Sequence, residues 1–256
     1  MRVFKYLLVL ILLVLAGAGI WLWRLPAATA WQQVQPRMPA VGLSGIGGTL
    51  WDGHADGISV LGHDLGKIHW QVPKWPALTG TPGAEVRIDG GEVELAGRVE
   101  RVAAGRYDVH ELRFSVPAAR LEALFGAGDV QLQGTLAGTL RHASFAGLDL
   151  RQLAGAARWS DVGVRTVRGE LQLADLLGEF ATQPDGTVVG TFKDDGSGAL
   201  AVAGTLSLRL PAWEAQATLR ARNDDPHTLE LLHGVGQLQA DGSTLVRAQG
   251  TLPGLR

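Results

Sequence analysis

The most regular pattern in the chain is the alternation of apolar and polar residues. From residue 41 onward, short runs place Val, Leu, Ile or Ala at every second position, with charged or amide residues between them. Val86 and Ile88 alternate with Glu85, Arg87 and Asp89 in this way. A period of two is typical of antiparallel strands with one dry and one solvated face. The pattern therefore predicts a mainly β domain over residues 41–256, with about a dozen strands.

Turn and helix signals interrupt this pattern. Hairpin turns are predicted at four glycine-containing sites, namely Asp89–Gly91, Pro184–Gly186, Asp194–Gly196 and Asp241–Gly242. Two or three short helices are expected. Their candidate segments are 117–125, 225–232 and a turn at 27–34, while 175–180 fits a helix and a strand equally.

The beginning of the chain lacks the alternation. Tyr6 to Trp23 is an uncharged run of 18 residues, preceded by Arg2 and Lys5, which favours a transmembrane helix with a cytoplasmic N-terminus. We expect a cytoplasmic tail at 1–5, a signal-anchor helix at 6–25, a linker at 26–40 and a periplasmic β domain at 41–256. The alternative is a cleaved signal peptide ending near Ala28-Thr29-Ala30. The length of the run favours the anchor, because the apolar region of a signal peptide usually spans only about 7–15 residues.

A Gly-Thr-Leu unit recurs through the β region. It stands at residues 48–50, 134–136, 138–140, 204–206 and 250–252, with Gly-Thr-Phe at 190–192 as a near copy. Because glycine permits bulges and bends, the repetition predicts a curled, repeat-like antiparallel sheet. Two or three short helices cannot cover the apolar face of such a sheet. We therefore expect it to fold over into a sandwich, to curl into a groove, or to be covered by a partner or a lipid.

Composition excludes several function classes. The net charge is −2 and basic residues are scattered singly, so no nucleic-acid partner is predicted. With no cysteine, the chain cannot form disulfides, thiolate metal sites or a cysteine nucleophile. The 35 glycines lie among apolar residues, which indicates an ordered sheet with many turns.

Candidate chemistry is concentrated after residue 50. A metal site would draw on the polar residues of this segment, which are Asp52, His54, Asp56, His63, Asp64 and His69. Their spacing matches no common metal motif, so solvent-facing positions are favoured. Residues 42–48 lack the lysine and the βαβ context of a phosphate-binding loop, and Ser44 lacks the second glycine of a nucleophile elbow. No cofactor and no catalytic residue is predicted.

The segment 45–55 carries a family resemblance. Its motif, Gly-x-Gly-Gly-Thr-Leu-Trp-Asp-Gly-x-Ala, comprises Gly45, Gly47, Gly48, Thr49, Leu50, Trp51, Asp52, Gly53 and Ala55. Together with Trp70 and Trp75-Pro76, it resembles the start of the periplasmic region of type II secretion system protein N. The resemblance implies a non-enzymatic accessory subunit in the inner membrane, which takes part in export of folded periplasmic proteins across the outer membrane. Its implied partners are the secretin or inner-membrane platform subunits.

Two other functions stay open at this point. A curled sheet behind a single membrane span also resembles the AsmA-like periplasmic proteins, which implies binding or transfer of lipid in an apolar groove. An enzyme is disfavoured because no group of residues satisfies the geometric requirements of a catalytic site.

Overall fold

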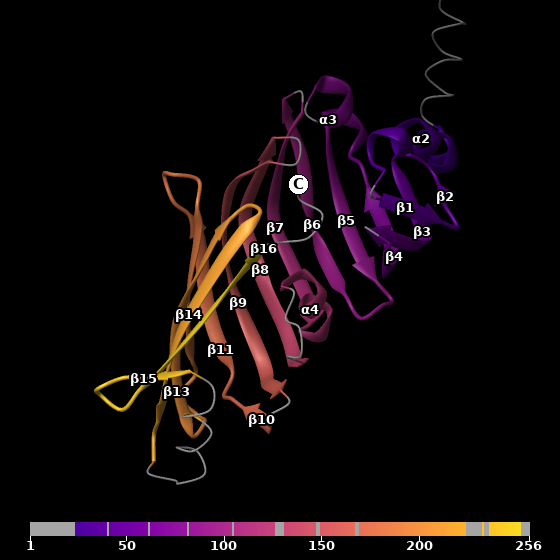
Figure 1. Ribbon diagram of the computed structural model, residues 1–256. Helices are drawn as coiled ribbons and strands as arrows, with labels where there is room; N and C mark the ends of the chain where they lie inside the picture. The colour runs from indigo at the N-terminus through magenta and orange to yellow at the C-terminus, as the bar shows by residue number, and fades with distance from the viewer. Residues whose placement is uncertain are drawn as a thin grey trace, which may run out of the picture. The chain divides into compact units, whose positions relative to one another are not determined.

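The computed structural model describes residues 24–251, except for 40, 61, 81, 104, 126–130, 147–148, 167–168, 224–231 and 233–235. These residues divide at position 91 into two compact units. Both units consist mainly of antiparallel strands with a few short helices (Figure 1). The mainly β class predicted from the alternation is confirmed.

The first unit is a small sheet with helical segments beside it. Its strands are ordered β1-β3-β4-β5, and β2 pairs with the start of β3. The elements are α2 (Ala27–Val34), η1 (Gln35–Arg37), β1 (Val41–Ser44), β2 (Gly47–Gly48), β3 (Asp52–Val60), β4 (His63–Gln71), α3 (Lys74–Thr79) and β5 (Gly83–Asp89). Its buried apolar side chains include Trp51, Ala55, Ile58 and Ile88.

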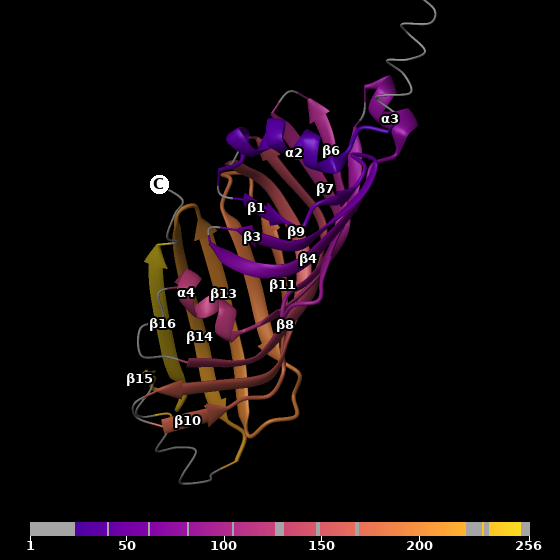
Figure 2. The same ribbon diagram turned by 90° about the vertical axis from the view of Figure 1, so that its right-hand side faces the viewer.

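The second unit is a longer sheet in which nearly every strand pairs with its neighbour in sequence. The order is β6-β7-β8-β9-β11-β12-β13-β14-β16-β15, and β10 pairs with β9. The elements are β6 (Glu94–Ala103), β7 (Arg106–Pro117), α4 (Ala119–Phe125), β8 (Gln131–Ala146), β9 (Asp149–Thr166), β10 (Gly169–Gln172), β11 (Leu176–Thr182), β12 (Val188–Asp194), β13 (Leu200–Arg209), β14 (Ala212–Ala221), β15 (Gln237–Leu238) and β16 (Thr244–Thr251). Figure 2 shows β13, β14 and β16 side by side.

The short helices agree with the sequence only in part. The predicted segments 27–34 and 117–125 are confirmed as α2 and α4, and 175–180 lies mostly in strand β11. Helix α3 was not predicted from the sequence, although Pro73 precedes it and Gly80 ends it in the left-handed conformation (φ 102°). The predicted helix 225–232 falls almost wholly outside the described residues.

The predicted membrane helix 6–25 also falls almost wholly outside them, and its last two residues, Arg24 and Leu25, are described and are not helical. Within the described residues, no helix is long and apolar enough to cross a membrane.

The core of the second unit lies where β10 and Leu232 pack on the sheet. Its buried members come from neighbouring strands and from Leu232, and they are Val162, Leu176, Leu200, Val202, Leu219 and Leu232. Trp159 and Phe192 pack against this cluster from its border and are only partly buried. Further buried apolar residues lie outside this cluster, among them Val109 and Ala143.

The expectation of a curled sheet is wrong, because the sheet is not curled. Of the glycines that open the Gly-Thr-Leu units, only Gly48 (φ 77°) and Gly134 (φ 95°) adopt positive φ, and Gly134 interrupts the register of β8. Gly138, Gly204 and Gly250 continue regular ladders with their neighbouring strands. Most copies of the unit therefore do not bend the chain.

Several strand glycines instead lie against aromatic rings of a neighbouring strand. Six pairs in the second unit place a glycine directly opposite an aromatic residue, and four of them are tightly packed, namely Phe114–Gly138, Phe180–Gly155, Phe192–Gly204 and Trp213–Gly250. In each of these four, a Cβ added to the glycine would lie within 3.0 Å of a ring atom. The ring occupies the space that a side chain on the partner strand would need.

These pairs continue into rows that cross the whole second unit. One row follows direct pairing through β6, β7, β8, β9, β11, β12, β13, β14 and β16, and consists of Leu95, Phe114, Gly138, Ala157, Gly178, Phe192, Gly204, Ala217 and Val246. Directly paired residues share a face, so this row forms an apolar band across the unit. The next row along the strands, on the opposite face, includes Arg113, Glu179, Gln216 and Arg247.

Candidate functional site

The motif segment 45–55 forms the β2–β3 hairpin. Thr49 closes its turn, because the Thr49 N–H donates to the Asp52 carbonyl (2.8 Å) and the Asp52 N–H donates to Thr49 Oγ1 (3.1 Å). Gly48 supplies the positive φ at the start of the turn. The Leu50 N–H donates to the Leu25 carbonyl (2.9 Å), so the turn also holds the chain that precedes α2.

Side chains of the motif alternate strictly between the two faces of β3. Trp51 and Ala55 are buried, at 8% and 1% exposure, whereas Asp52 and His54 are exposed. Gly53 faces the ring of Trp70 on β4, whose Nε1–H donates to the Leu50 carbonyl (3.1 Å). The hairpin is therefore locked by its own polar groups and by two tryptophans.

The metal candidates of the first unit do not converge. Asp52, His54, Asp56, His63, Asp64 and His69 are all exposed in the structure. His54 and His69 are directly paired, with ring centroids 6.0 Å apart. No three of these side chains bring their ligand atoms within 4.8 Å of one another, and among the described residues only the group Asp108, His110 and His142 does so.

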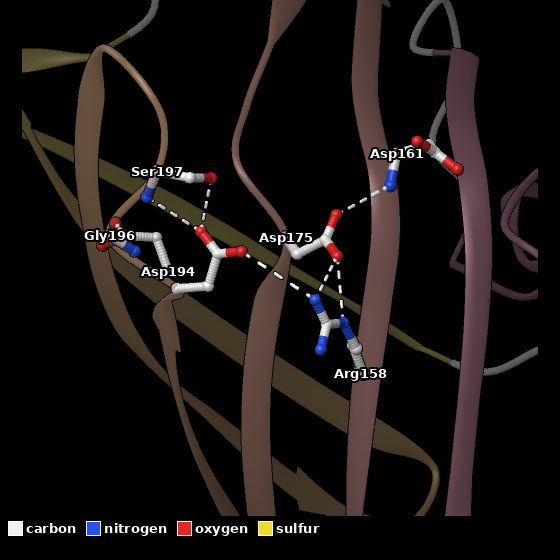
Figure 3. A network of polar contacts seen from close by, with 7 residues as sticks. Arg158, Asp161, Asp175, Asp194, Gly196 and Ser197 are labelled. Carbon is white, nitrogen blue, oxygen red and sulfur yellow. Dashed lines mark hydrogen bonds and ion pairs between the residues drawn. The ribbon is translucent and has the colours of Figure 1, made fainter.

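A charged network joins three segments of the second unit (Figure 3). Arg158 of β9 donates from Nε (2.9 Å) and Nη2 (2.7 Å) to Asp175 Oδ2, between β10 and β11. The Asp161 N–H donates to the other oxygen of that carboxylate (3.0 Å). Asp195, in the β12–β13 turn, lies 3.9 Å from Arg158 and accepts hydrogen bonds from the backbone and hydroxyl of Ser197 (2.9 and 2.6 Å).

The carboxylates of this network are held in the ionised form. Hydrogen bonds from Arg158, and then from the Asp161 backbone, lower the pKa of Asp175 below its ordinary value. Hydrogen bonds from the Ser197 hydroxyl and backbone lower the pKa of Asp195. Both groups are thus poorly suited to acid–base chemistry near neutral pH, and the network fastens the turn beside the core.

Strand β16 forms the free edge of the second unit in its described part. The two residues of β15 pair only with Leu245 and Thr244. From Val246 to Thr251, β16 pairs with β14 on one side and with no described strand on the other. An edge of this kind presents unpaired backbone groups that a further strand can bind.

The hydrogen bonds of the neighbouring strands show which residues of β16 direct their backbone N–H and C=O groups away from the sheet. The Gln239 N–H donates to the Ser243 carbonyl (2.7 Å), so odd-numbered residues of β16 bond towards β15. On the far side of β14, the Arg222 N–H donates to the Ala199 carbonyl (2.9 Å), which leaves odd-numbered β14 residues to bond even-numbered β16 residues. The backbone groups of Arg247, Gln249 and Thr251 therefore point away from the sheet.

Sequence reasoning missed both the edge and the histidine cluster. Asp108 and His110 alternate along one strand, but His142 lies 32 residues after His110. A β7–β8 register was needed to see that His110 and His142 pair directly. The edge was missed because β14 and β16 carry the same alternating pattern as the interior strands.

Comparison with known proteins finds similarity to one family over most of the chain. The model of the family described as Type II secretion system (T2SS), protein N matches residues 39–247. A protein of Klebsiella pneumoniae named Type II secretion system protein N is 28% identical over 193 residues, which cover 74% of this chain and 75% of that protein. The Vibrio cholerae protein of the same name is 28% identical over 235 residues, 89% of this chain and 91% of its own length.

No solved structure shows a significant match to the chain. The family match nevertheless covers most of both units, from before β1 to Arg247, which is the fourth of the eight residues of β16. This chain therefore belongs to the type II secretion system protein N family, as a structural component of that machinery rather than an enzyme.

Proposed function

We propose that this secretion component binds another subunit of the machinery by strand addition at the outer edge of β16. The unpaired edge from Val246 to Thr251 is the observation that carries the proposal. Backbone hydrogen bonds would supply affinity, and the side chains on the two faces of β16 would supply specificity. Among the described residues of this edge, Arg247 is the sole charge and there is no proline, so little blocks an incoming strand.

The two faces of the edge favour a partner strand of alternating character. Val246, Ala248 and Gly250 continue the apolar rows of the sheet, whereas Arg247 and Gln249 continue the polar face. An added strand with apolar residues at every second position would extend both faces without burying a charge. Strands of that pattern are the proposed partner chemistry.

The location proposed for the protein follows the sequence. Residues 1–5 would lie in the cytoplasm, 6–25 would cross the inner membrane, 26–40 would form a linker, and 41–256 would extend into the periplasm. The uncharged run Tyr6–Trp23 behind Arg2 and Lys5 supports this arrangement. N-terminal sequencing of the mature protein from inner membranes tests it, and a mature chain beginning at Trp31 would contradict it.

Crosslinking in cells tests the edge directly. Because the chain has no cysteine, one introduced cysteine is its only thiol. Arg247→Cys places it on the edge strand, and Thr205→Cys places it on the same polar face in the interior of the sheet, where β12 and β14 flank β13. We expect Arg247→Cys to crosslink to another secretion subunit and Thr205→Cys not to do so.

Two proline substitutions distinguish a loss of binding at the edge from a loss of the fold. Gln249→Pro removes an outward N–H, so the β14–β16 ladder should persist while the crosslink at position 247 disappears. Ala248→Pro removes an N–H that bonds to β14 and should destabilise the sheet, whereas Gln249→Ala controls for the lost side chain. A crosslink that survives Gln249→Pro, or that joins two copies of this chain, would overturn the proposal.

A further inference from the structure

A small polar cluster on β7 and β8 has no part in the edge or in the charged network. Asp108 and His110 stand two residues apart on β7, and His142 lies directly opposite His110 on β8. One ligand atom from each residue lies within 4.8 Å of the other two. We propose that Asp108, His110 and His142 bind a divalent transition-metal ion of the zinc class.

The distances suit such an ion. His142 Nε2 lies 3.6 Å from Asp108 Oδ2, and the His110 and His142 ring centroids are 5.2 Å apart. In a tetrahedral zinc site with bonds near 2.0–2.1 Å, neighbouring ligand atoms are about 3.3 Å apart. The ligand atoms, which lie within 4.8 Å of one another, would approach this spacing by rotation of the imidazole rings, because the χ2 torsion of histidine is broad.

The backbone has two irregularities beside the cluster. Glu111 adopts positive φ (51°) where β7 carries an extra residue against β6, and β8 carries one between Leu140 and His142 against β9. Bulges bend a strand and re-aim the side chains next to them. Here Val109 and Ala143 pair and are buried, while the metal-binding side chains are partly exposed.

The charged residues around the cluster are of both signs, and they include Arg151 of β9, which lines the same pocket as His142. On β6, Arg98 lies opposite His110 and Glu100 lies opposite Asp108, so this strand adds one positive and one negative residue. On β8, the neutral Ser144 lies opposite Asp108. The Asp108 carboxylate therefore supplies the charge that favours a cation, and the two imidazoles supply the nitrogen ligands that zinc, copper and nickel prefer.

Three protein ligands leave the fourth position of a tetrahedral ion for water or another donor. The Asp108 and His142 side chains are 24% and 33% exposed, so solvent and dissolved metal reach the cluster. The bound ion would link β7 to β8 near the loop between β6 and β7. The proposal is independent of the strand-addition function, because it uses neither β16 nor its residues.

Metal titration of the full-length chain tests the proposal. The protein is purified with a tag that contains no histidine, treated with chelator, and titrated with Zn²⁺ by calorimetry; Co²⁺ absorption reports tetrahedral nitrogen and oxygen ligation. We expect one ion per chain. Since loss of a residue that merely supports a metal ligand weakens binding about 10–100-fold, His142→Ala and Asp108→Asn should weaken it by at least that factor.

The other cross-strand histidine pair provides a matched control. His69→Ala removes one of two facing imidazoles whose neighbours form no three-ligand group, and it should leave the affinity unchanged. Circular dichroism establishes that each variant is folded. If His142→Ala does not fold, Asp108→Asn, which keeps the shape of the side chain, decides the question. Equal Zn²⁺ affinity of wild type and Asp108→Asn, or loss of binding in His69→Ala, would overturn the site.

Discussion

Gly204→Ala and Gly190→Ala should have opposite effects on stability, although both place one methyl group beside a phenylalanine in the same sheet. Gly204 lies opposite Phe192, and Gly190 lies opposite Phe180. A Cβ at position 204 would meet the Phe192 ring and the Gln216 carbonyl oxygen, each at 2.4 Å. A Cβ at position 190 would find its nearest neighbour, the Phe180 Cβ, at an ordinary 3.4 Å.

The expected magnitudes follow from these contacts. Overpacking at position 204 should lower the free energy of unfolding by about 1–3 kcal/mol, since neither a packed ring nor a backbone carbonyl moves freely. Alanine at position 190 should raise it by about 0.4–1 kcal/mol, because alanine restricts the unfolded chain without strain in the strand. In a unit of this size, each kcal/mol corresponds to a change in Tm of about 2–4 °C.

Urea unfolding of the two variants, followed by tryptophan fluorescence and circular dichroism, measures the difference. A double-mutant cycle with Phe192→Ala then apportions it. Removing the ring should relieve part of the cost of Gly204→Ala, with a coupling of about 0.5–3 kcal/mol, while the contact with the Gln216 carbonyl stays. If the two alanine variants shift the midpoint equally, or if the cycle shows no coupling, the glycines do not act as seats for the rings.

Two further predictions concern the motif hairpin and the charged network. Trp51→Ala should destabilise the protein by about 3–5 kcal/mol, because Trp51 is buried, whereas Asp52→Ala and His54→Ala change exposed positions and should leave Tm nearly unaltered; a Trp51→Ala variant that melts like wild type would contradict the buried role. The pKa of Asp175 is lower in the folded than in the unfolded chain, so its stabilising effect is present above the unfolded value and is lost as the pH falls through the folded one. Asp175→Asn should therefore reduce the loss of stability in acid, below about pH 4, and unchanged acid denaturation curves would refute the stabilising role of its bond to Arg158.

The sequence was sufficient to predict the strands, because the alternation of apolar and polar residues depends only on which face of its own strand each residue occupies. The hairpins with Gly186, Gly196 and Gly242 were equally local, since each of these glycines adopts the positive φ that its turn requires. The curled sheet failed for a different reason. Whether Gly204 bends the chain or faces Phe192 depends on the register of β12 with β13, which neither strand specifies alone.

The interaction surfaces were less predictable than the fold for the same reason. The burial of Trp51 depends on neighbours close in the chain, because it directly precedes β3 and the exposed Asp52 follows it. The grouping of Asp108, His110 and His142 depends on pairing between strands and on two bulges. The free edge of β16 depends on the strand order of the sheet, in which no other described strand pairs with Val246–Thr251.

The pairing of rings with glycines also constrains how sequences of this family can diverge. At the Phe192–Gly204 pair, a side chain gained by the glycine has no room, and a ring lost from the phenylalanine leaves the space above the glycine unfilled. The two positions are therefore free to change mainly together, for instance by exchanging the large and the small residue between the strands. A lineage can thus alter most of its residues, as the 28% identity to the Vibrio cholerae protein illustrates, while the sum of side-chain volumes across each such pair stays nearly constant.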